Sequence, residues 1–468
     1  AQSWTKLLGN DGGYGTYDMA LDSNANMTIA GYGGSEVKTS DTTIYVVPFK
    51  PFASLAMLIN LDSAGHYRWH ASLHTAEAVV IAAAPDGGIA VGGNFVCDTL
   101  ILGNDTLLSP IINLKMFVAR YNAQGQHLWS ITTDSNFEDV SSTTDVAVDA
   151  NGNLLAVGTF TNALYLPNDT ITGNSFFIRL DPTGNLLYKS NVQAEHIALG
   201  LDDSYYLARG SLIQKFNAND SLLWHTQASG AIKHVDADGL GYVYAAIGDT
   251  HIDKFSPDGQ LNMEIDPPGK WLEAINATAT GELLVGLVRE SGFPSYNIGT
   301  IARFNAAGAY SNEVNLGHRI VENEAAHTIY AALKSYGDQK VFLAGKTGMN
   351  SPLIYLHDTL MGYGNIDMLA GCVDQSEFYV ALNDPKTHEV KVLVYPNPFS
   401  VSVTIETAVP NRWKVRLVDA TGRTIHRTRW NSANGPLQLQ LANIPSGAYQ
   451  LVLTSSQNQT VGKTIIKQ

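Results

Sequence analysis

The chain has 468 residues, of which 45% are hydrophobic and only 15% are charged, and its formal net charge is −14. This much apolar material is enough for a large core or several domains, so the composition argues against a disordered chain. The acidic balance argues against DNA or RNA as a partner, because the phosphate backbone would be repelled. The 42 glycines and 17 prolines, with no long window of helical periodicity, predict an all-β protein of short strands joined by tight turns.

The chain begins with Ala-Gln-Ser-Trp, without an initiator methionine or a basic-then-apolar leader. We expect from this that a signal peptide has already been removed. No run of about 18 apolar residues occurs, so no transmembrane segment is expected. The two cysteines, Cys97 and Cys372, give neither a disulfide framework nor a zinc-type spacing. Each is expected to be a small buried apolar residue rather than a reactive thiol.

A strand, a polar turn and a second strand recur along the first 380 residues. The pattern is clearest in Asp145 to Tyr188, where DVAVDA and LLAVGTF flank the turn NGN, and FFIRLD and LLYKS follow as third and fourth strands. Four short strands cannot bury both of their faces alone, so each unit needs a neighbour of the same kind. The hairpin recurs eight times, at residues 17–33, 77–93, 143–159, 193–209, 231–247, 272–288, 317–333 and 365–381.

The second half of the unit also repeats, as an apolar-basic-aromatic strand, a turn and often a tryptophan. It occurs at residues 58–69, 118–129, 177–188, 213–224, 252–263 and 301–312. An aromatic residue at the same point of successive units is best explained by packing between adjacent sheets. We therefore expect Trp69, Trp129, Tyr188 and Trp224 to be core residues rather than ligand contacts.

The two ends of this repeat region complement each other. SWTKL, with Trp4, resembles a fourth strand whose first three strands are missing, whereas the hairpin at 365–381 lacks a clear fourth strand. The N-terminal strand is therefore expected to complete the last sheet, which would remove two open sheet edges. Such closure predicts a β-propeller over residues 1–388. We expect eight blades, with seven as the alternative because the region 313–390 is the most degenerate.

Two of the long units carry a resemblance. The segments GNFVCDTLILGNDTLLSP with KMFVARYNAQGQHLWS, and GTFTNALYLPNDTITGN with SFFIRLDPTGNLLYKS, resemble β-propeller repeats of secreted and surface proteins of the Bacteroidetes phylum. The resemblance implies a fold and brings no catalytic residues with it.

The composition changes near residue 390. Residues 391–468 contain nine Lys/Arg and two Asp/Glu, a net charge of +7, whereas residues 1–390 contain 20 and 41, a net charge of −21. Such asymmetry marks a boundary between two domains. Alternating segments separated by turns at ATG, SANG and PSG predict a small β-sandwich of about seven strands over residues 391–468.

This tail closely resembles the C-terminal sorting domain of the type IX secretion system. The resemblance rests on four motifs in order, YPNPF, LVDATGR, IPSGAY and GKTIIK. The candidate sorting-signal residues in them are Tyr395, Pro396, Asn397, Pro398, Asp419, Gly422, Arg423, Gly447, Tyr449 and Lys463. The family implies recognition by the export machinery, passage across the outer membrane, and usually removal of the tail with retention on the cell surface or release. An unrelated β-sandwich used for binding is the alternative.

Several candidate sites in the propeller have a simpler explanation. His66, His70 and His74 lie four residues apart, but on a strand that spacing separates neighbours by roughly 13 Å, too far to share one ion. DSNAN, DANGN and DADGLG resemble pieces of calcium loops, but they fall in hairpin turns where Asp, Asn and Gly are favoured for backbone reasons. No metal site is therefore expected. No nucleotide-binding or hydrolase motif is found either, so no cofactor and no catalytic residue is assigned.

Two function classes remain open. In the first, the propeller is a binding or adhesion module that presents a rigid, acidic, aromatic-containing surface to a glycan, peptide or partner protein, aided by the long insertions at 33–55 and 94–116. In the second, it is a secreted hydrolase or lyase, which would need carboxylates such as Asp145, Asp236 and Asp367 to converge on the central channel. The absence of a catalytic motif favours the binding module.

Overall fold

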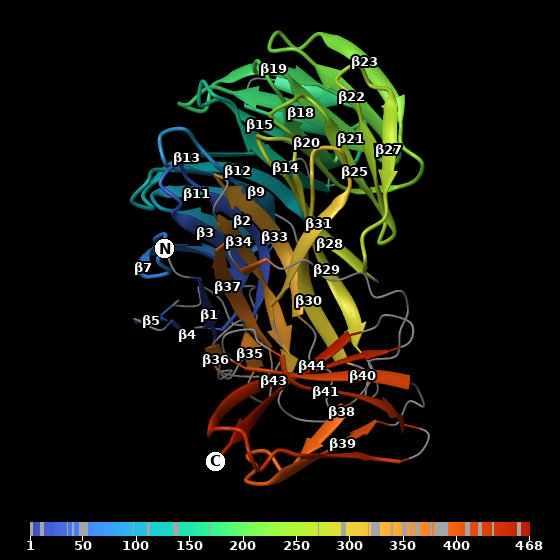
Figure 1. Cartoon of the computed structure of the whole chain (residues 1–468). Helices are drawn as coiled ribbons and strands as arrows, with labels where there is room; N and C mark the ends of the chain where they lie inside the picture. Colours follow the sequence, from blue (N-terminus) through green and yellow to red (C-terminus); the bar gives the residue numbers. More distant parts are fainter. Residues whose placement is uncertain are drawn as a thin grey trace. The chain divides into compact units, whose positions relative to one another are not determined.

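The chain divides into two compact units, residues 1–381 and residues 382–468 (Figure 1). The computed structural model describes residues 3–9, 14–34, 36–39, 42–45, 55–96, 98–109, 113–133, 140–167, 169–269, 271–291, 296–316, 318–319, 328–337, 340–348, 353–355, 358–360, 366–374, 377–378, 392–407, 412–419, 424–432, 435–455 and 460–468. The domain boundary expected between residues 388 and 391 lies outside these ranges, as does Cys97. In the described ranges, no helix is long and apolar enough to cross a bilayer.

The first unit is built from antiparallel sheets of four strands, which we number as blades in chain order. Blade 1 contains β2 (Gly15–Leu21), β3 (Met27–Tyr32), β6 (Leu55–Leu61) and β7 (Tyr67–His74); blade 2 contains β8 (Ala76–Ala83), β9 (Ile89–Phe95), β12 (Lys115–Tyr121) and β13 (His127–Thr132); blade 3 contains β14 (Ser141–Val148), β15 (Leu154–Phe160), β18 (Ser175–Leu180) and β19 (Leu186–Ser190). In each blade the strands follow one another from the inside to the outside of the ring.

The remaining blades follow the same order. Blade 4 contains β20 (His196–Leu199), β21 (Tyr205–Arg209), β22 (Leu212–Phe216) and β23 (Leu222–Gln227); blade 5 contains β24 (Ile232–Ala237), β25 (Val243–Ile247), β26 (His251–Phe255) and β27 (Leu261–Ile265); blade 6 contains β28 (Trp271–Ala277), β29 (Leu283–Ser291), β30 (Tyr296–Phe304) and β31 (Tyr310–Asn315); blade 7 contains β33 (Thr328–Tyr336), β34 (Lys340–Gly348), β37 (Ile366–Asp374) and β1 (Trp4–Leu8).

Short sheets are inserted between the strands of some blades. They are β4 (Glu36–Lys38) with β5 (Thr43–Tyr45), β10 (Asp98–Leu102) with β11 (Asp105–Ser109), β16 (Ala163–Leu166) with β17 (Asp169–Thr172), and β32 (His318–Arg319) with β35 (Leu353–Tyr355) and β36 (Asp358–Leu360). The hairpins β4–β5, β10–β11 and β16–β17 lie between the second and third strands of blades 1, 2 and 3, which explains why these three units are long in the sequence.

The all-β propeller expected from the sequence is confirmed, but the number of blades is not. The described residues form seven blades, and the prediction of eight was wrong. The segments 317–333 and 365–381 were assigned to two separate inner hairpins, yet β33 pairs with β34, and β37 is the third strand of the same sheet. The inner and third strands of a blade are both covered by neighbouring blades, so an apolar pattern cannot distinguish one from the other.

The ring is closed by the N-terminal strand, as the sequence predicted. β1 pairs with β37 along its whole length, from Trp4 opposite Cys372 to Leu8 opposite Met368, and so forms the outer edge of blade 7 (Figure 1). On the inside, each inner strand contacts the next, and β33 contacts β2. The two ends of the propeller sequence therefore stabilise one sheet together. Cys372 is fully buried in that sheet, and burial raises the pKa of its thiol to about 11.

Adjacent blades are joined by the repeated tryptophan of the outer strand. The indole N–H of Trp129 donates to the carbonyl oxygen of Pro182 in the next blade at 2.9 Å, and a Cβ added at Gly184 would lie 2.9 Å from the indole ring. Gly184 also has a φ of +91°, so this turn favours glycine on both grounds. The indole N–H groups of Trp4, Trp69 and Trp224 donate in the same way to the carbonyl oxygens of Ser63, Ala123 and Pro257. The tryptophans pack between blades as expected, and Tyr188 occupies the equivalent position in blade 3, against Phe177.

Replacing one of these tryptophans should weaken the contact between two blades. We expect Trp129→Ala to lower the free energy of unfolding by roughly 2–3 kcal/mol, somewhat less than a fully buried aromatic residue, because it loses both ring packing and a hydrogen bond. Leu128→Ala is the matched control, since the neighbouring Leu128 is 51% exposed and its loss should change stability by less than about 0.5 kcal/mol. Urea unfolding of both variants measures the difference, and equal effects would show that the tryptophan does not join the blades.

The second unit consists of two sheets that share one core. β38 (Val392–Tyr395), β39 (Ser402–Thr407) and β42 (Leu437–Gln440) form one sheet, and β41 (Thr424–Asn431), β40 (Arg412–Val418), β43 (Gly447–Ser455) and β44 (Thr460–Lys467) form the other. Val403 and Ile405 of the first sheet belong to the same buried cluster as Trp413, Val415 and Leu451 of the second. The alternating segments of the tail thus form a compact β-sandwich.

Candidate functional site

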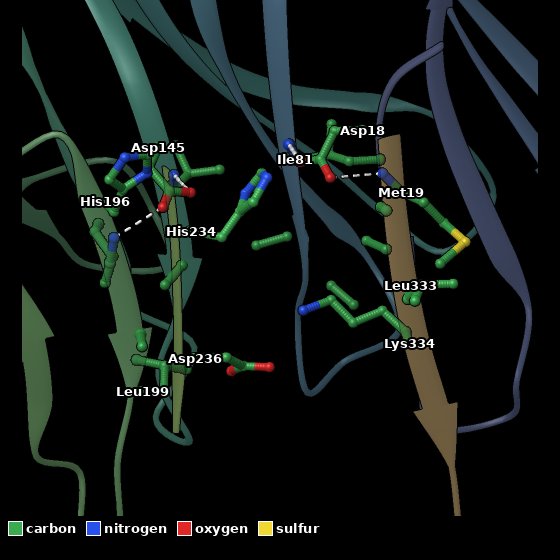
Figure 2. A pocket seen from close by; sticks show the side chains of 18 of the residues that line it. Asp18, Met19, Ile81, Asp145, His196, Leu199, His234, Asp236, Leu333 and Lys334 are labelled. Atoms are coloured by element: carbon green, nitrogen blue, oxygen red, sulfur yellow. Dashed lines mark hydrogen bonds between the residues drawn. The ribbon is translucent and has the colours of Figure 1, made fainter. Parts of the chain in front are cut away.

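The inner strands place two rings of side chains around the axis of the propeller. In most of them a β-bulge precedes one residue, and that residue and its equivalents form what we call the first channel ring: Asp18, Val80, Asp145, His196, His234, Ala274 and Ala332. The residues two positions later form the second channel ring: Ala20, Ala82, Ala147, Ala198, Asp236, Asn276 and Lys334. Since side chains alternate along a strand, both rings face the same side. All but Val80 and Asn276 line a cavity of about 420 Å³ (Figure 2).

Asp18 and Asp145 each hold two adjacent blades together. One carboxylate oxygen of each accepts the N–H of the next residue in its own strand, at 2.7 and 2.8 Å respectively. The other oxygen reaches the following blade, where Asp18 accepts the N–H of Ile81 at 2.8 Å and Asp145 accepts that of Ile197 at 2.8 Å. These bonds fix the orientation of both carboxylates in the channel wall.

The two carboxylates have unusual acidities. Burial raises the pKa of Asp18 to about 6 and that of Asp145 to about 7, although the backbone hydrogen bonds and the charge of Lys334 act in the opposite direction. The negative charge of Asp18 also raises the pKa of Asp145, so the two groups interact across the channel. A cation bound between them would favour the ionised form of both.

Two histidines from neighbouring blades complete the polar part of the first ring. Burial lowers the pKa of His234 to about 4, and the proximity of His196 acts in the same direction. Burial lowers the pKa of His196 as well. Both imidazoles are therefore neutral at pH 7 and can each accept one hydrogen bond and donate another. Nε2 of His234 has no hydrogen-bond partner among the described residues.

The second channel ring has an apolar half and a polar half. Blades 1 to 4 contribute only alanine, whereas blades 5 to 7 contribute Asp236, Asn276 and Lys334. Asp236 accepts the N–H of Ala277 in blade 6 at 2.9 Å, and Asn276 accepts the N–H of Ser335 in blade 7 at 2.7 Å, so both repeat the bridging of Asp18 and Asp145. Lys334 is the only lysine or arginine among the described lining residues.

The sequence placed two of its three candidate carboxylates correctly. Asp145 and Asp236 line the channel from blades 3 and 5. Asp367 does not, because β37 is a third strand; its side chain is fully buried there, where a Cβ on Gly9 would collide with it. Asp18 was missed, although it lies four residues before the turn residue Asp22 just as Asp145 lies four before Asp149. His234 has the same signal, because it lies four residues before the turn residue Asp238, whereas the residue four after His196 is a glycine. Lys334 belongs to the second channel ring, to which this spacing does not apply.

The aromatic residues expected at the channel are not there. The described residues lining the cavity include no Trp, Tyr or Phe. Among the described residues, the three spaced histidines form no metal-binding group; His66 Nδ1 lies 3.2 Å from Asp62, and His70 Nδ1 lies 2.8 Å from the hydroxyl of Tyr67.

The turns that resemble calcium loops use their aspartates for the backbone, as expected. Asp22 accepts the N–H groups of Asn24 and Asn26 at 2.8 Å each. Asp149 and Asp238 make the same bonds in blades 3 and 5.

The described sorting-signal residues are mostly exposed, but two of them are bonded to other parts of the sandwich. Asn397 is tied to β44, since its amide donates to Thr464 at 3.0 Å and its oxygen accepts the N–H of Ile466 at 2.9 Å. Tyr449 is buried, and its hydroxyl donates to the carbonyl oxygen of Pro445 at 2.7 Å. The side chains of Tyr395, Pro396, Pro398 and Lys463 are exposed; Gly447 begins β43 and Asp419 follows β40; Gly422 and Arg423 lie outside the described residues.

Comparison with known proteins identifies the second unit. Residues 393–467 match the family described as the secretion system C-terminal sorting domain. None of the curated protein sequences matches the chain.

Solved structures resemble the chain only distantly. A protein of unknown function from Bacteroides caccae is 12% identical, covers 55% of this chain and 89% of its own, and gives a TM-score of 0.37. The WD40 β-propeller domain of Doa1 is 9% identical over 79% and 97% of the two chains, with a TM-score of 0.42. BamB from Moraxella catarrhalis is 11% identical over 76% and 96%, with a TM-score of 0.38. The fold assignment therefore rests on the strand pairing itself. The chain therefore combines a β-propeller with a C-terminal unit that matches the secretion system C-terminal sorting domain.

Proposed function

We propose that the propeller is a binding module, exported to the cell surface by its sorting domain, and that its axial channel holds a ligand with an ammonium group. Such a group is present in the lysine side chain of a peptide and in an amino sugar. The observation that carries the proposal is the pair of carboxylates, Asp18 and Asp145, which face one cavity from blades 1 and 3 with fixed orientation.

The chemistry of the cavity favours a cation over other ligands. Three carboxylates line it against a single lysine, so the wall attracts positive charge. The raised pKa values of Asp18 and Asp145 show that each loses solvation without gaining a full counter-charge. An ammonium ion supplies that charge, and neutral His196 and His234 can accept its remaining hydrogen bonds. The alanines of the second ring would contact the carbon chain that carries it.

A second candidate function is favoured by one observation. A pKa of about 7 would let Asp145 act as a general acid or base near neutral pH. Both of its oxygens, however, already accept backbone N–H groups, which hold the carboxylate against the wall. This commitment favours recognition over proton transfer.

Calorimetric titration of the full chain tests the ammonium site. We expect N-acetyl-lysine methylamide or glucosamine to bind, and the ε-acetylated lysine or N-acetylglucosamine to bind at least tenfold more weakly, because acetylation removes the charge. The two pairs distinguish a peptide from an amino sugar. Affinity should increase from pH 5 to pH 8 as Asp18 and Asp145 ionise.

Asp145→Ala is the variant for this titration. Ala274 and Ala332 occupy the same ring position in blades 6 and 7, so alanine fits the fold. Loss of binding in this variant supports the proposal. Equal binding of the charged and acetylated compounds would contradict it, and a change in the mass of a recovered compound would replace it with the enzymatic alternative.

For the sorting domain, we propose that two exposed motif residues and two motif residues that tie its strands together have separate roles. Tyr395 and Lys463 are exposed and available to the type IX secretion machinery, whereas Asn397 and Tyr449 hold the sandwich together. Lys463→Ala should then reduce export without lowering stability, while Tyr449→Ala should lower both.

A further inference from the structure

A second cavity lies far out on the propeller, between blades 1 and 2. It has a volume of about 500 Å³ and is lined by Ala71 and Ser72 of β7, by Gly103 and Asn104 of the β10–β11 hairpin, and by Tyr121 and His127 of blade 2. The residues that line the axial channel belong to other strands or other segments, so this cavity is a separate site.

Two buried polar groups of this cavity have no hydrogen-bond partner among the described residues. The hydroxyl of Tyr121 is one, in a residue that is only 2% exposed. Nε2 of His127 is the other, in a side chain that is 5% exposed. Nε2 lies 3.7 Å from Oδ2 of Asp105, which is too far for a hydrogen bond, and that oxygen already accepts the N–H and the hydroxyl of Ser130.

These groups are close to one another without being bonded. The Tyr121 and His127 rings meet edge to face, with centroids 5.4 Å apart. Burial, together with the charge of Asp105, raises the pKa of Tyr121, and burial lowers the pKa of His127, so both side chains are neutral at pH 7. A buried polar group without a partner is destabilising by about 1–3 kcal/mol, so a polar atom brought in by a ligand would be bound favourably here.

The other blades show that the fold does not need polar residues at these positions. Tyr121 and His127 form the last pair of β12 and β13 before the turn. The equivalent pairs are Leu61 with Tyr67, Leu180 with Leu186, Phe216 with Leu222, Phe255 with Leu261, and Phe304 with Tyr310. Only blade 2, among these six, has a histidine in the pair, and both residues of that pair line the cavity.

We propose that this cavity, here called the blade 1–2 subsite, binds a neutral carbohydrate residue through its hydroxyl groups. A sugar hydroxyl can donate to one group and accept from another, which is what the tyrosine hydroxyl and the neutral imidazole of this cavity offer together. No lysine or arginine is among the described lining residues, which disfavours an anionic ligand. Gly125 also lines the cavity, and the ring of Trp69 packs against it. A Cβ added at Gly125 would lie 2.5 Å from that ring. The subsite is independent of the proposed function of the channel.

Saturation-transfer NMR on the full chain tests this subsite. The probes are the methyl glycosides of glucose, galactose and mannose, together with lactose and cellobiose. We expect at least one of them to bind, and the double variant Tyr121→Phe, His127→Leu to weaken that binding at least tenfold. The variant reproduces the pair found in blades 4 and 5, so it should fold, and its melting temperature should be unchanged or higher because two unpaired polar groups are removed.

Two further variants make the result specific. Lys189→Ser changes the equivalent hairpin contact of blade 3, where Lys189 pairs with Asp169, and should leave saccharide binding unchanged. Asp145→Ala should also leave it unchanged, which separates this subsite from the channel. The proposal is overturned if none of the probes binds, if binding survives the double variant, or if the double variant lowers the melting temperature, because the pair would then hold only an internal water.

Discussion

Removal of residues 1–8 should destroy the cooperative unfolding of the propeller. The deletion takes away β1, exposes the hydrogen-bonding edge of β37, and removes Leu8 and Leu7, which are 0% and 5% exposed, from two different core clusters. It also removes the bond from Trp4 to Ser63 that joins blade 7 to blade 1. With roughly 2–5 kcal/mol for each buried leucine, the expected loss exceeds about 5 kcal/mol, which is comparable to the whole stability of an ordinary domain. Urea unfolding followed by tryptophan fluorescence measures it.

Two comparisons make this result interpretable. Removal of residues 1–2 alone should have little effect, since Ser3, whose hydroxyl accepts the N–H of Asp374 at 2.8 Å, remains. A synthetic peptide of residues 1–9 should restore the unfolding transition of the truncated chain by pairing with β37. If the truncated chain unfolds like the intact one, β1 does not close the ring.

The second large effect is the pH dependence of stability caused by Asp145. Its pKa is raised from 3.8 to about 7 in the folded chain, so its contribution to stability is fully present below pH 3.8 and is lost as pH rises through 7. Asp145→Ala lacks the titrating carboxyl group, so the variant does not lose this stability as pH rises. Relative to the unaltered chain, the variant should therefore gain roughly 2–3 kcal/mol of stability between pH 5 and pH 8. Denaturant unfolding at a series of pH values measures the difference.

Other titrating groups in the channel make the comparison with the variant necessary. Asp18 acts in the same direction as Asp145, whereas His196 and His234, whose pKa values are lowered, lose stability as pH falls. Asp181→Asn is the control, because hydrogen bonds within its turn hold the pKa of Asp181 far below this range and Asn122 occupies the same turn position. Its effect on stability should be the same at pH 5 and pH 8. If the difference in unfolding free energy between Asp145→Ala and the unaltered chain does not change with pH, Asp145 titrates normally.

Much of the propeller could be predicted because its sequence repeats what the structure repeats. Six of the hairpins found in the sequence correctly predicted the first two strands of blades 1 to 6. The repeated Trp69, Trp129 and Trp224 correctly predicted contacts between each outer strand and the next blade. Trp4 even revealed the closing strand. Blade 7 was misread because its inner strand β33 and third strand β37 are both covered by neighbours and show the same apolar pattern.

The candidate site was harder to predict, because it is assembled from single residues of different blades. Asp145 could be found from its strand alone, and alignment of the repeats would have added Asp18 and His234. Lys334 lies in a ring set by β-bulges, and a bulge shifts which residues face the axis. The polar pair Tyr121 and His127 stands out only when strand pairing has shown which residues of the other blades are its equivalents.

If Asp18 and Asp145 hold an ammonium group in the channel, binding of that group should release protons from the two carboxyl groups. The number of protons released is therefore the decisive measurement. Calorimetric titration with N-acetyl-lysine methylamide at pH 6.5, in buffers of different ionisation enthalpy, gives the number of protons released on binding. With pKa values of about 6 and 7 in the free protein, both carboxylates are partly protonated at that pH, and a bound cation should release roughly one proton in total. Binding without proton release would show that Asp18 and Asp145 do not hold the cation.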